Sequence, residues 1–124
     1  MIPFVSSSVL IVDDHAGFRT AARAMLDQMG LRVLGEAESG EGAIESVLEL
    51  RPDIVLLDIQ LPGIDGIEVA RRLQAVVPPP VIVLTSTRDA VDYGSRLVTV
   101  PAAIFVAKSD LTRESLDEAI QGTG

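Results

Sequence analysis

Short apolar segments alternate with amphipathic ones along the whole chain. Five segments rich in branched apolar residues lie at positions 9–12, 31–37, 54–57, 81–84 and 104–107. Segments of this length and character are typical of strands that are buried on both faces of a parallel sheet. We therefore expect five short strands, spaced so that a helix fits between each strand and the next.

The intervening segments carry apolar residues at helical spacing. We expect five helices, at positions 16–28, 40–50, 65–76, 89–98 and 111–120. Ser39 can cap the second of these helices, and Ser109 or Asp110 can cap the last. The helix at 89–98 is expected to be a weak one, because Gly94 lies inside it.

Strands that alternate with helices in this way predict an α/β fold. Parallel strands need crossover connections, and crossovers of one hand leave few topologies open. We expect the flavodoxin-like (βα)5 arrangement, a five-stranded parallel sheet of order 2-1-3-4-5 with helices on both faces. The length of 124 residues suits a single domain, 1–124.

Composition excludes several classes of function. The chain has no cysteine, which excludes disulfides and thiolate metal sites. Its net charge of -8, with one tyrosine and no tryptophan, argues against direct binding of nucleic acid. No apolar stretch reaches the roughly 18 residues of a membrane span, and the N-terminus lacks the basic start of a signal peptide. We therefore expect a cytoplasmic protein without a membrane partner.

Three aspartates directly follow two of the expected strands. Asp13 and Asp14 come after the run at 9–12, and Asp58 comes after the run at 54–57. Open α/β sheets bind ligands at the carboxyl edge of their strands, where adjacent first and third strands bring these side chains together. Converging like charges raise one another's pKa or require a cation. Carboxylate ligands suit Mg²⁺, so the spacing predicts a magnesium-assisted phosphoryl site.

Several motifs occur in the same order as in a known family. They are Val12-Asp13-Asp14-His15, Arg51-Pro52-Asp53-Ile54-Val55-Leu56-Leu57-Asp58, Leu61-Pro62-Gly63-Ile64-Asp65-Gly66-Ile67-Glu68, Val83-Leu84-Thr85 and Lys108. With these motifs the chain resembles the receiver domains of bacterial two-component response regulators. Two segments resemble most the subfamily with a LuxR-type helix-turn-helix output domain, namely Asp13-Asp14-His15 and Lys108-Ser109-Asp110-Leu111. We expect no output domain within this sequence, and a stand-alone receiver and a piece of a longer regulator both remain open.

The resemblance implies a role for each residue of the acidic site. Asp58 would accept a phosphoryl group from a sensor histidine kinase in a Mg²⁺-dependent transfer. Asp14 and Asp58 would bind Mg²⁺ directly and Asp13 through water, while the backbone carbonyl of Gln60 would complete the protein ligands. Lys108 would neutralise charge on the other side, and would pair with Asp58 in the absence of a phosphoryl group. Such a domain is no enzyme, since it catalyses only its own phosphorylation and slow autodephosphorylation.

The resemblance also implies how phosphorylation changes the surface. The Thr85 hydroxyl would donate a hydrogen bond to the new phosphoryl group. The Phe105 ring would then swing inward and reshape the surface of the fourth helix, fifth strand and fifth helix, to control an output or a partner. Gln60 and Thr87 would flank the path of the hydrolytic water. A homodimer is one expected outcome of activation.

The chain departs from the family pattern around the fifth strand. Pro101 and Ile104 stand where family members usually carry glycine, and Ser109 follows the lysine where proline is frequent. Proline fixes φ and lacks an N–H, so the backbone before the fifth strand must differ locally. These changes leave the acceptor chemistry intact and bear on the switch surface. They keep open a pseudo-receiver that binds partners without phosphorylation.

Other classes of protein fit the sequence less well. A phosphatase of haloacid-dehalogenase type needs a second aspartate two residues after its nucleophile, where Gln60 stands. A flavin or nucleotide binder needs a phosphate-cradling loop after the first strand, which the acidic Asp13-Asp14 pair opposes. Single residues also have simpler interpretations, with Asp13 as a helix cap and Phe105 as a core residue. His15 is expected to be an exposed first-turn residue, because no cysteine or second histidine accompanies it.

Overall fold

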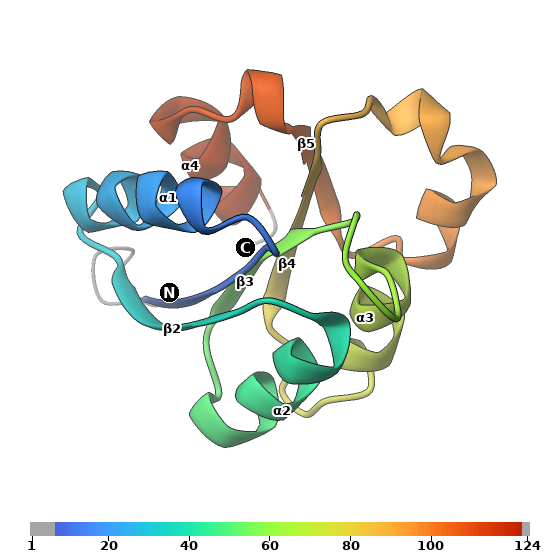
Figure 1. The fold of residues 1–124 in the computed structure, drawn as a ribbon, viewed down its shortest axis with the longest axis horizontal. Coiled ribbons are helices and arrows are strands. Elements are labelled where there is room, and N and C mark those ends of the chain that lie inside the picture. Colours follow the sequence, from blue (N-terminus) through green and yellow to red (C-terminus); the bar gives the residue numbers. More distant parts are fainter. Residues whose placement is uncertain (1–6, 123–124) are drawn as a thin grey trace.

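The centre of the protein is a parallel sheet with the strand order β2-β1-β3-β4-β5 (Figure 1). The computed structural model describes residues 7–122. The strands are β1 (Ser8–Val12), β2 (Arg32–Ala37), β3 (Ile54–Asp58), β4 (Val81–Ser86) and β5 (Ile104–Ala107). The predicted fold class and strand order are therefore confirmed, and β1 lies directly beside β3.

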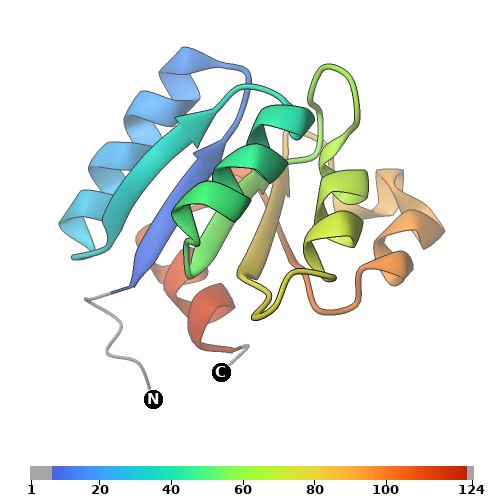
Figure 2. The same cartoon turned by 90° about the horizontal axis from the view of Figure 1, so that it is seen from below.

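Helices cover both faces of the sheet. The α-helices of the described residues are α1 (Ala16–Gln28), α2 (Gly40–Leu50), α3 (Gly66–Leu73) and α4 (Arg113–Gln121). Within residues 7–122, three 3₁₀ segments complete the connections, η2 (Ala90–Asp92), η3 (Gly94–Thr99) and η4 (Lys108–Asp110). Helices α1 and α4 pack on one face, α2 and α3 on the other, and η3 contacts α3 (Figures 1 and 2). None of the helices within residues 7–122 has the length and apolar character that crossing a membrane requires.

The two central strands are buried on both faces, as their apolar runs predicted. No residue at positions 9–12 or 54–57 exposes more than 2% of its surface. Side chains alternate along each strand, so that Leu10 and Leu57 join the core under α2 and α3, while Ile11 and Leu56 join the core under α1 and α4. Because both faces of these strands are apolar, a shift of one residue in strand register would change the burial of side chains little. The polar residues at the strand ends must therefore help to fix the register.

Capping residues set where the helices begin. The Ser39 hydroxyl accepts a hydrogen bond from the Gly42 N–H at 3.1 Å and caps α2, as predicted. The predicted cap of the last helix at Ser109 or Asp110 is wrong, because these residues belong to η4. Helix α4 starts after Thr112, which forms a reciprocal capping box with Ser115. That pair satisfies two backbone N–H groups that the predicted start would have left open.

The helix predicted at 89–98 is not an α-helix. The segment forms η2 and η3, which meet at Gly94, where a φ of 53° places the backbone in the left-handed region. Val91 and Val98 are 82% and 75% exposed, so the apolar residues do not form one inward stripe. The prediction failed because helical spacing was assumed across a glycine that turns the chain.

Polar side chains fasten this segment to its neighbours. Arg96 donates to Asp65 at 2.6 Å, and Arg71 donates to Thr99 at 3.2 Å. Burial raises the pKa of Asp65, but the N–H of Glu68 and the guanidinium of Arg96 outweigh it and hold the pKa below its ordinary value. Hydrogen bonds and an ion pair thus hold the segment to α3 and its cap, in addition to the packing of Tyr93 and Leu97 on the core.

Pro101 fits the turn that leads into β5. The Ala103 N–H donates to the Val100 carbonyl at 3.0 Å, which closes a turn with Pro101 in its second position. The fixed φ of proline suits that position, and the missing N–H is not needed there. The departure from the family pattern is therefore accommodated locally.

Gly66 lies against the backbone at the end of β3. A Cβ built on it would lie 2.2 Å from the carbonyl oxygen of Asp58 and 2.7 Å from Cα of Ile59, whereas a Cβ on Gly17 of α1 would meet no atom within 4 Å. Gly66→Ala should lower the free energy of unfolding by about 1–3 kcal/mol, since backbone must move. The matched control Gly17→Ala should raise it by about 0.5–1 kcal/mol. Urea unfolding measures both, and equal stabilities would contradict the close approach.

Candidate functional site

The register of the parallel strands carries several polar residues to one edge of the sheet. Asp13 follows β1, whose last residue pairs with Leu57, and Asp58 is the next residue of β3. Asp58 itself pairs with Thr85 of β4. Lys108 follows β5, whose last residue pairs with the end of β4. Residues that are up to 95 positions apart in the sequence thereby meet at the carboxyl edge.

The carboxylates converge as the sequence predicted. One ligand atom from each of Asp13, Asp14, His15 and Asp58 lies within 4.8 Å of the others. The side chain of Asp13 is fully buried and that of Asp58 is 2% exposed, whereas Asp14 is 38% and His15 is 73% exposed. The cluster therefore has a buried floor and an open side that faces solvent.

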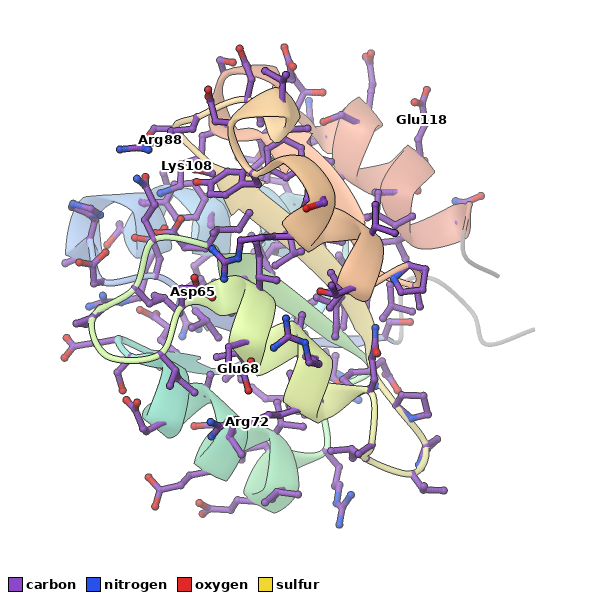
Figure 3. The ribbon with its side chains drawn as sticks, turned by 90° about the vertical axis from the view of Figure 1, so that its right-hand side faces the viewer. Asp65, Glu68, Arg72, Arg88, Lys108 and Glu118 are labelled. Atoms are coloured by element: carbon purple, nitrogen blue, oxygen red, sulfur yellow. The ribbon has the colours of Figure 1, made fainter. Side chains whose placement is uncertain are left out.

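Lys108 provides the positive charge of the cluster. Its Nζ lies 2.6 Å from Oδ2 of Asp13 and 3.7 Å from Oδ2 of Asp58, and its side chain is only 14% exposed. Figure 3 shows Lys108 on the same side of the molecule as Asp65 and Arg88. The predicted pairing with Asp58 is the longer of the two contacts, so Asp13 is the main partner of the ammonium group.

The carboxyl group of Asp58 is perturbed by its surroundings. Burial raises the pKa of Asp58 to about 6, and the charge of Asp13 adds to the rise, with a smaller contribution from Asp14. The ammonium of Lys108 and the backbone N–H of Gln60, 3.2 Å from Oδ1, oppose it. One ammonium thus fails to compensate the crowded negative charge, which favours the binding of a cation.

Thr85 contributes a buried hydroxyl with no hydrogen-bond partner among residues 7–122. A buried polar group without a partner costs about 1–3 kcal/mol. Its place in register beside Asp58 means that an acceptor added to that carboxylate would be close to this donor. This buried donor fits a ligand with oxygen acceptors at the end of β3.

Phe105 is connected to the same strand end through Tyr93. The two rings lie 6.2 Å apart between centroids at an interplanar angle of 55°. The Tyr93 hydroxyl lies 2.5 Å from the hydroxyl of Ser86, the residue that follows Thr85. The half-buried Phe105 ring is therefore in contact with a chain of groups that begins at the site.

The set of ligand atoms fits a hard divalent cation. Carboxylates dominate the cluster, and such oxygen donors suit Mg²⁺. The uncompensated charge around Asp58 and the unpartnered hydroxyl of Thr85 both point to a group that the site is built to receive. The residues present therefore agree with a magnesium site that also admits a phosphoryl group.

Sequence reasoning missed two features of the site. The guanidinium of Arg19 donates to the backbone carbonyl of Asp13 at 2.7 Å and to Glu36 at 2.8 Å, which fixes the loop after β1. No pattern in the sequence around Arg19 predicts this contact. His15 is exposed as predicted, but its Nδ1 lies 3.1 Å from a carboxylate oxygen of Asp14, closer to the acidic cluster than expected.

A count of residue types also singles out Lys108, which the motifs had already indicated. The chain contains nine arginines and one lysine, and that lysine lies in the acidic cluster. The surface ion pairs that Glu36, Asp65 and Glu68 form outside the cluster use arginine. A lysine ammonium is a compact charge that can change partners, whereas a guanidinium favours fixed planar contacts.

Asp58→Asn should stabilise the metal-free protein at neutral pH. Folding raises the pKa of this carboxyl from 3.8 to about 6, so stability falls as pH rises through that window. The asparagine variant lacks this loss, and its free energy of unfolding at pH 7.5 should be higher by on the order of 1–3 kcal/mol. The advantage should vanish below about pH 4. Urea unfolding in the presence of a chelator measures it.

The exposed Asp27 on α1 offers a matched control for this titration. Asp27→Asn should show no comparable dependence of stability on pH. A stability difference for Asp58→Asn that stays constant from pH 4 to pH 8 would show that its carboxyl is not perturbed.

Known proteins share both the sequence pattern and the fold. The family description "Response regulator receiver domain" matches residues 9–121. The response regulator GacA of Pseudomonas viridiflava is 40% identical over 81% of this chain and 47% of its own length. The virulence-factor transcription regulator BvgA of Bordetella pertussis is 36% identical over 91% of this chain and 54% of its own length. The chain thus spans about half the length of these relatives.

A solved structure agrees with these sequence relatives. A LuxR-family two-component response regulator from an Aurantimonas species has a TM-score of 0.83 and 27% identity, and covers 94% of this chain and 84% of that one. The region that the family description matches, residues 9–121, includes all the strand ends that form the acidic site, from Asp13 to Lys108. The chain belongs to the receiver domains of two-component response regulators.

Proposed function

We propose that Asp58 is the phosphoacceptor of this receiver and that a sensor histidine kinase is the donor. The observation that carries the proposal is the setting of Asp58 at the end of β3. Its carboxylate lies between further carboxylates and one ammonium, with the unpartnered hydroxyl of Thr85 next to it in register. The cytoplasmic location expected from the sequence is part of the proposal.

The carboxylate acts as the nucleophile. One oxygen of Asp58 forms a bond to phosphorus while the bond from phosphorus to the donor nitrogen breaks, and the donor imidazole keeps that electron pair and takes a proton from solvent. Carboxylates form such acyl phosphates in other phosphoryl-transfer proteins. Since its pKa is about 6, Asp58 is mostly ionised at neutral pH and is ready to attack. Positioning and charge neutralisation supply the rest of the catalysis.

The metal ligands are proposed in the same way. Bound Mg²⁺ neutralises charge on the oxygens of the transferring group. Asp14 and Asp58 hold the ion directly, Asp13 acts through water, and the Gln60 backbone carbonyl completes the protein ligands. The contacts support this division, because Lys108 already occupies an oxygen of buried Asp13, while Asp14 is partly open to solvent.

Lys108 and Thr85 respond to the new phosphoryl group. The ammonium moves from Asp13 to a phosphoryl oxygen, and the Thr85 hydroxyl donates to another. Hydrogen bonds to charged groups contribute about 1.5–3 kcal/mol each. Two such bonds supply much of the roughly 5 kcal/mol that turns a mostly inactive population into a mostly active one.

The output is a change of the surface around β5. Movement at Thr85 acts on Ser86 and Tyr93, and Phe105 loses its present ring contact as it turns inward. The segments at 90–99 and 104–121 then present a new surface. We propose 1–124 as a single receiver domain that does not itself bind nucleic acid. Its surface acts on a further domain, a partner or a second copy in an activated homodimer.

Phosphorylation with a small donor tests the proposal. Incubation with acetyl phosphate and Mg²⁺ should add one phosphoryl group, seen by intact-mass spectrometry. Asp58→Asn and removal of divalent metal by a chelator should each reduce the yield by at least about a hundred-fold, because the nucleophile or the neutralising charge is lost. The control Asp27→Asn should be phosphorylated like the wild type. Labelling that persists in Asp58→Asn would identify another acceptor, and no labelling of the wild type would favour a pseudo-receiver.

The lifetime of the phosphoryl group tests the exposed side of the site. The Thr87 hydroxyl donates to the Gln60 side chain at 3.0 Å, and the Gln60 backbone N–H donates to Asp58. This contact restricts the path of water toward phosphorus, so Thr87→Ala and Gln60→Ala should each shorten the lifetime by about three-fold or more. The exposed Thr20 of α1 provides the control Thr20→Ala. Decay rates equal to the wild type in both variants would remove Gln60 and Thr87 from the site.

A further inference from the structure

The ammonium of Lys108 has a third neighbour besides its two carboxylates. Its Nζ lies 4.3 Å from the centroid of the Phe18 ring, over the face of that ring. Phe18 comes from the first turn of α1, on the other side of the loop that carries Asp13 and Asp14. The lysine is thus enclosed by carboxylates on one side and by an aromatic face on another.

This distance is well inside the range at which a cation is attracted by the negative face of an aromatic ring. The attraction extends to about 6 Å and grows when the cation is desolvated. Lys108 is 14% exposed, so little water competes with the ring. The contact therefore contributes more here than a similar contact on an open surface.

The Phe18 ring is itself held in place. It packs against the core cluster under α1 and α4, which includes Ile11, Ala22 and Leu116. A ring that is fixed along one side by the core presents a stable face to the ammonium. Phe18 thus provides a rigid wall rather than an adaptable neighbour.

An aromatic face also leaves the donors of the ammonium free. Lysine has three N–H donors and no acceptor, and Phe18 attracts the whole cation without being a directed acceptor for one of them. Asp13 accepts a hydrogen bond from the ammonium in the present state, and Asp58 forms a longer ion pair with it at 3.7 Å. When the ammonium exchanges a carboxylate for a phosphoryl oxygen, it can move along the ring without losing this attraction.

We propose that Phe18 is a positioning residue that keeps the Lys108 ammonium at the acidic site while its acceptors change. The role of the ammonium in phosphoryl transfer rests on the proposed function, whereas the contact itself does not. Phe18 touches no reacting atom and acts through the lysine. Its chemistry requires an aromatic ring, which separates it from a residue that only fills the core.

The first experiment observes the contact directly. Because Lys108 is the only lysine of the chain, selective labelling with ¹³C-lysine gives one set of side-chain NMR signals. In the wild type the ring should shift the ε-proton resonance upfield by at least about 0.3 ppm from that of free lysine, as expected for protons over an aromatic face. Phe18→Leu should remove most of this shift, and Phe18→Tyr should keep it. Met25→Leu, a matched change in α1 against the same core cluster, should also keep it.

The second experiment measures the rate of phosphorylation by acetyl phosphate with Mg²⁺. Phe18→Leu should slow the reaction by about five- to ten-fold, the size expected for a largely desolvated cation–ring contact. Phe18→Tyr and Met25→Leu should stay within about two-fold of the wild type, since one retains the aromatic face and the other leaves Phe18 unchanged.

The two measurements separate the inference from the function on which it rests. An unshifted lysine signal in the wild type, or a shift that survives in Phe18→Leu, overturns the contact whether or not Asp58 is phosphorylated. A lost shift with an unchanged rate in Phe18→Leu overturns the positioning role. An equal slowing in Phe18→Leu and Phe18→Tyr does so too, because it shows a requirement for shape alone. A wild type that shows the shift but accepts no phosphoryl group refutes the proposed function and the positioning role, and keeps only the contact.

Discussion

Crowding of negative charge at one edge of the sheet is the constraint on which the structure depends. The fold forces the carboxylates of Asp13 and Asp58 into a nearly solvent-free space, with Asp14 at its rim. Water cannot screen these charges there. Burial and the charge of Asp13 raise the pKa of Asp58, and the ammonium of Lys108 opposes this rise only in part. The site is therefore unfavourable as it stands, and a bound cation would relieve the repulsion.

The remainder of the molecule keeps these charges in place. Strands that are apolar on both faces tie β1 and β3 into the core, so the carboxylates cannot separate to relieve their repulsion. Arg19 holds the backbone of the first loop, and Gly66 allows the start of α3 to press on the backbone of Asp58. Phe18 adds an apolar wall beside the only lysine. Rigid support of this kind costs the protein some stability locally and makes the site responsive to ligands.

The side of the molecule formed by the segment at 90–99 is built differently. The segment at 90–99 exposes Val91 and Val98, packs on the core through the partly buried Tyr93 and Leu97, and is also held by polar contacts of Arg96, Arg71 and Tyr93. Such contacts can be exchanged at little cost, whereas the packing of buried side chains cannot. A rigid acidic site and a lightly fastened neighbouring segment therefore meet at β4, where the unpartnered Thr85 hydroxyl lies between them. This arrangement suits the transmission of a local change in charge to a surface.

The sequence by itself determined the fold class and the identity of the residues at the strand ends, from Asp13 to Lys108, and it left a few strand orders open, of which the expected one is confirmed. Strands that are buried on both faces appear in the sequence as short, continuous apolar runs. The residue that follows such a strand lies at the carboxyl edge of the sheet. Only the tertiary structure decided that Lys108 pairs mainly with Asp13 and rests on Phe18, and that positions 89–98 turn at Gly94 instead of forming an α-helix. These outcomes depend on distances of a few ångströms between groups that are far apart in the sequence. They also depend on a backbone turn that the spacing of apolar residues does not predict.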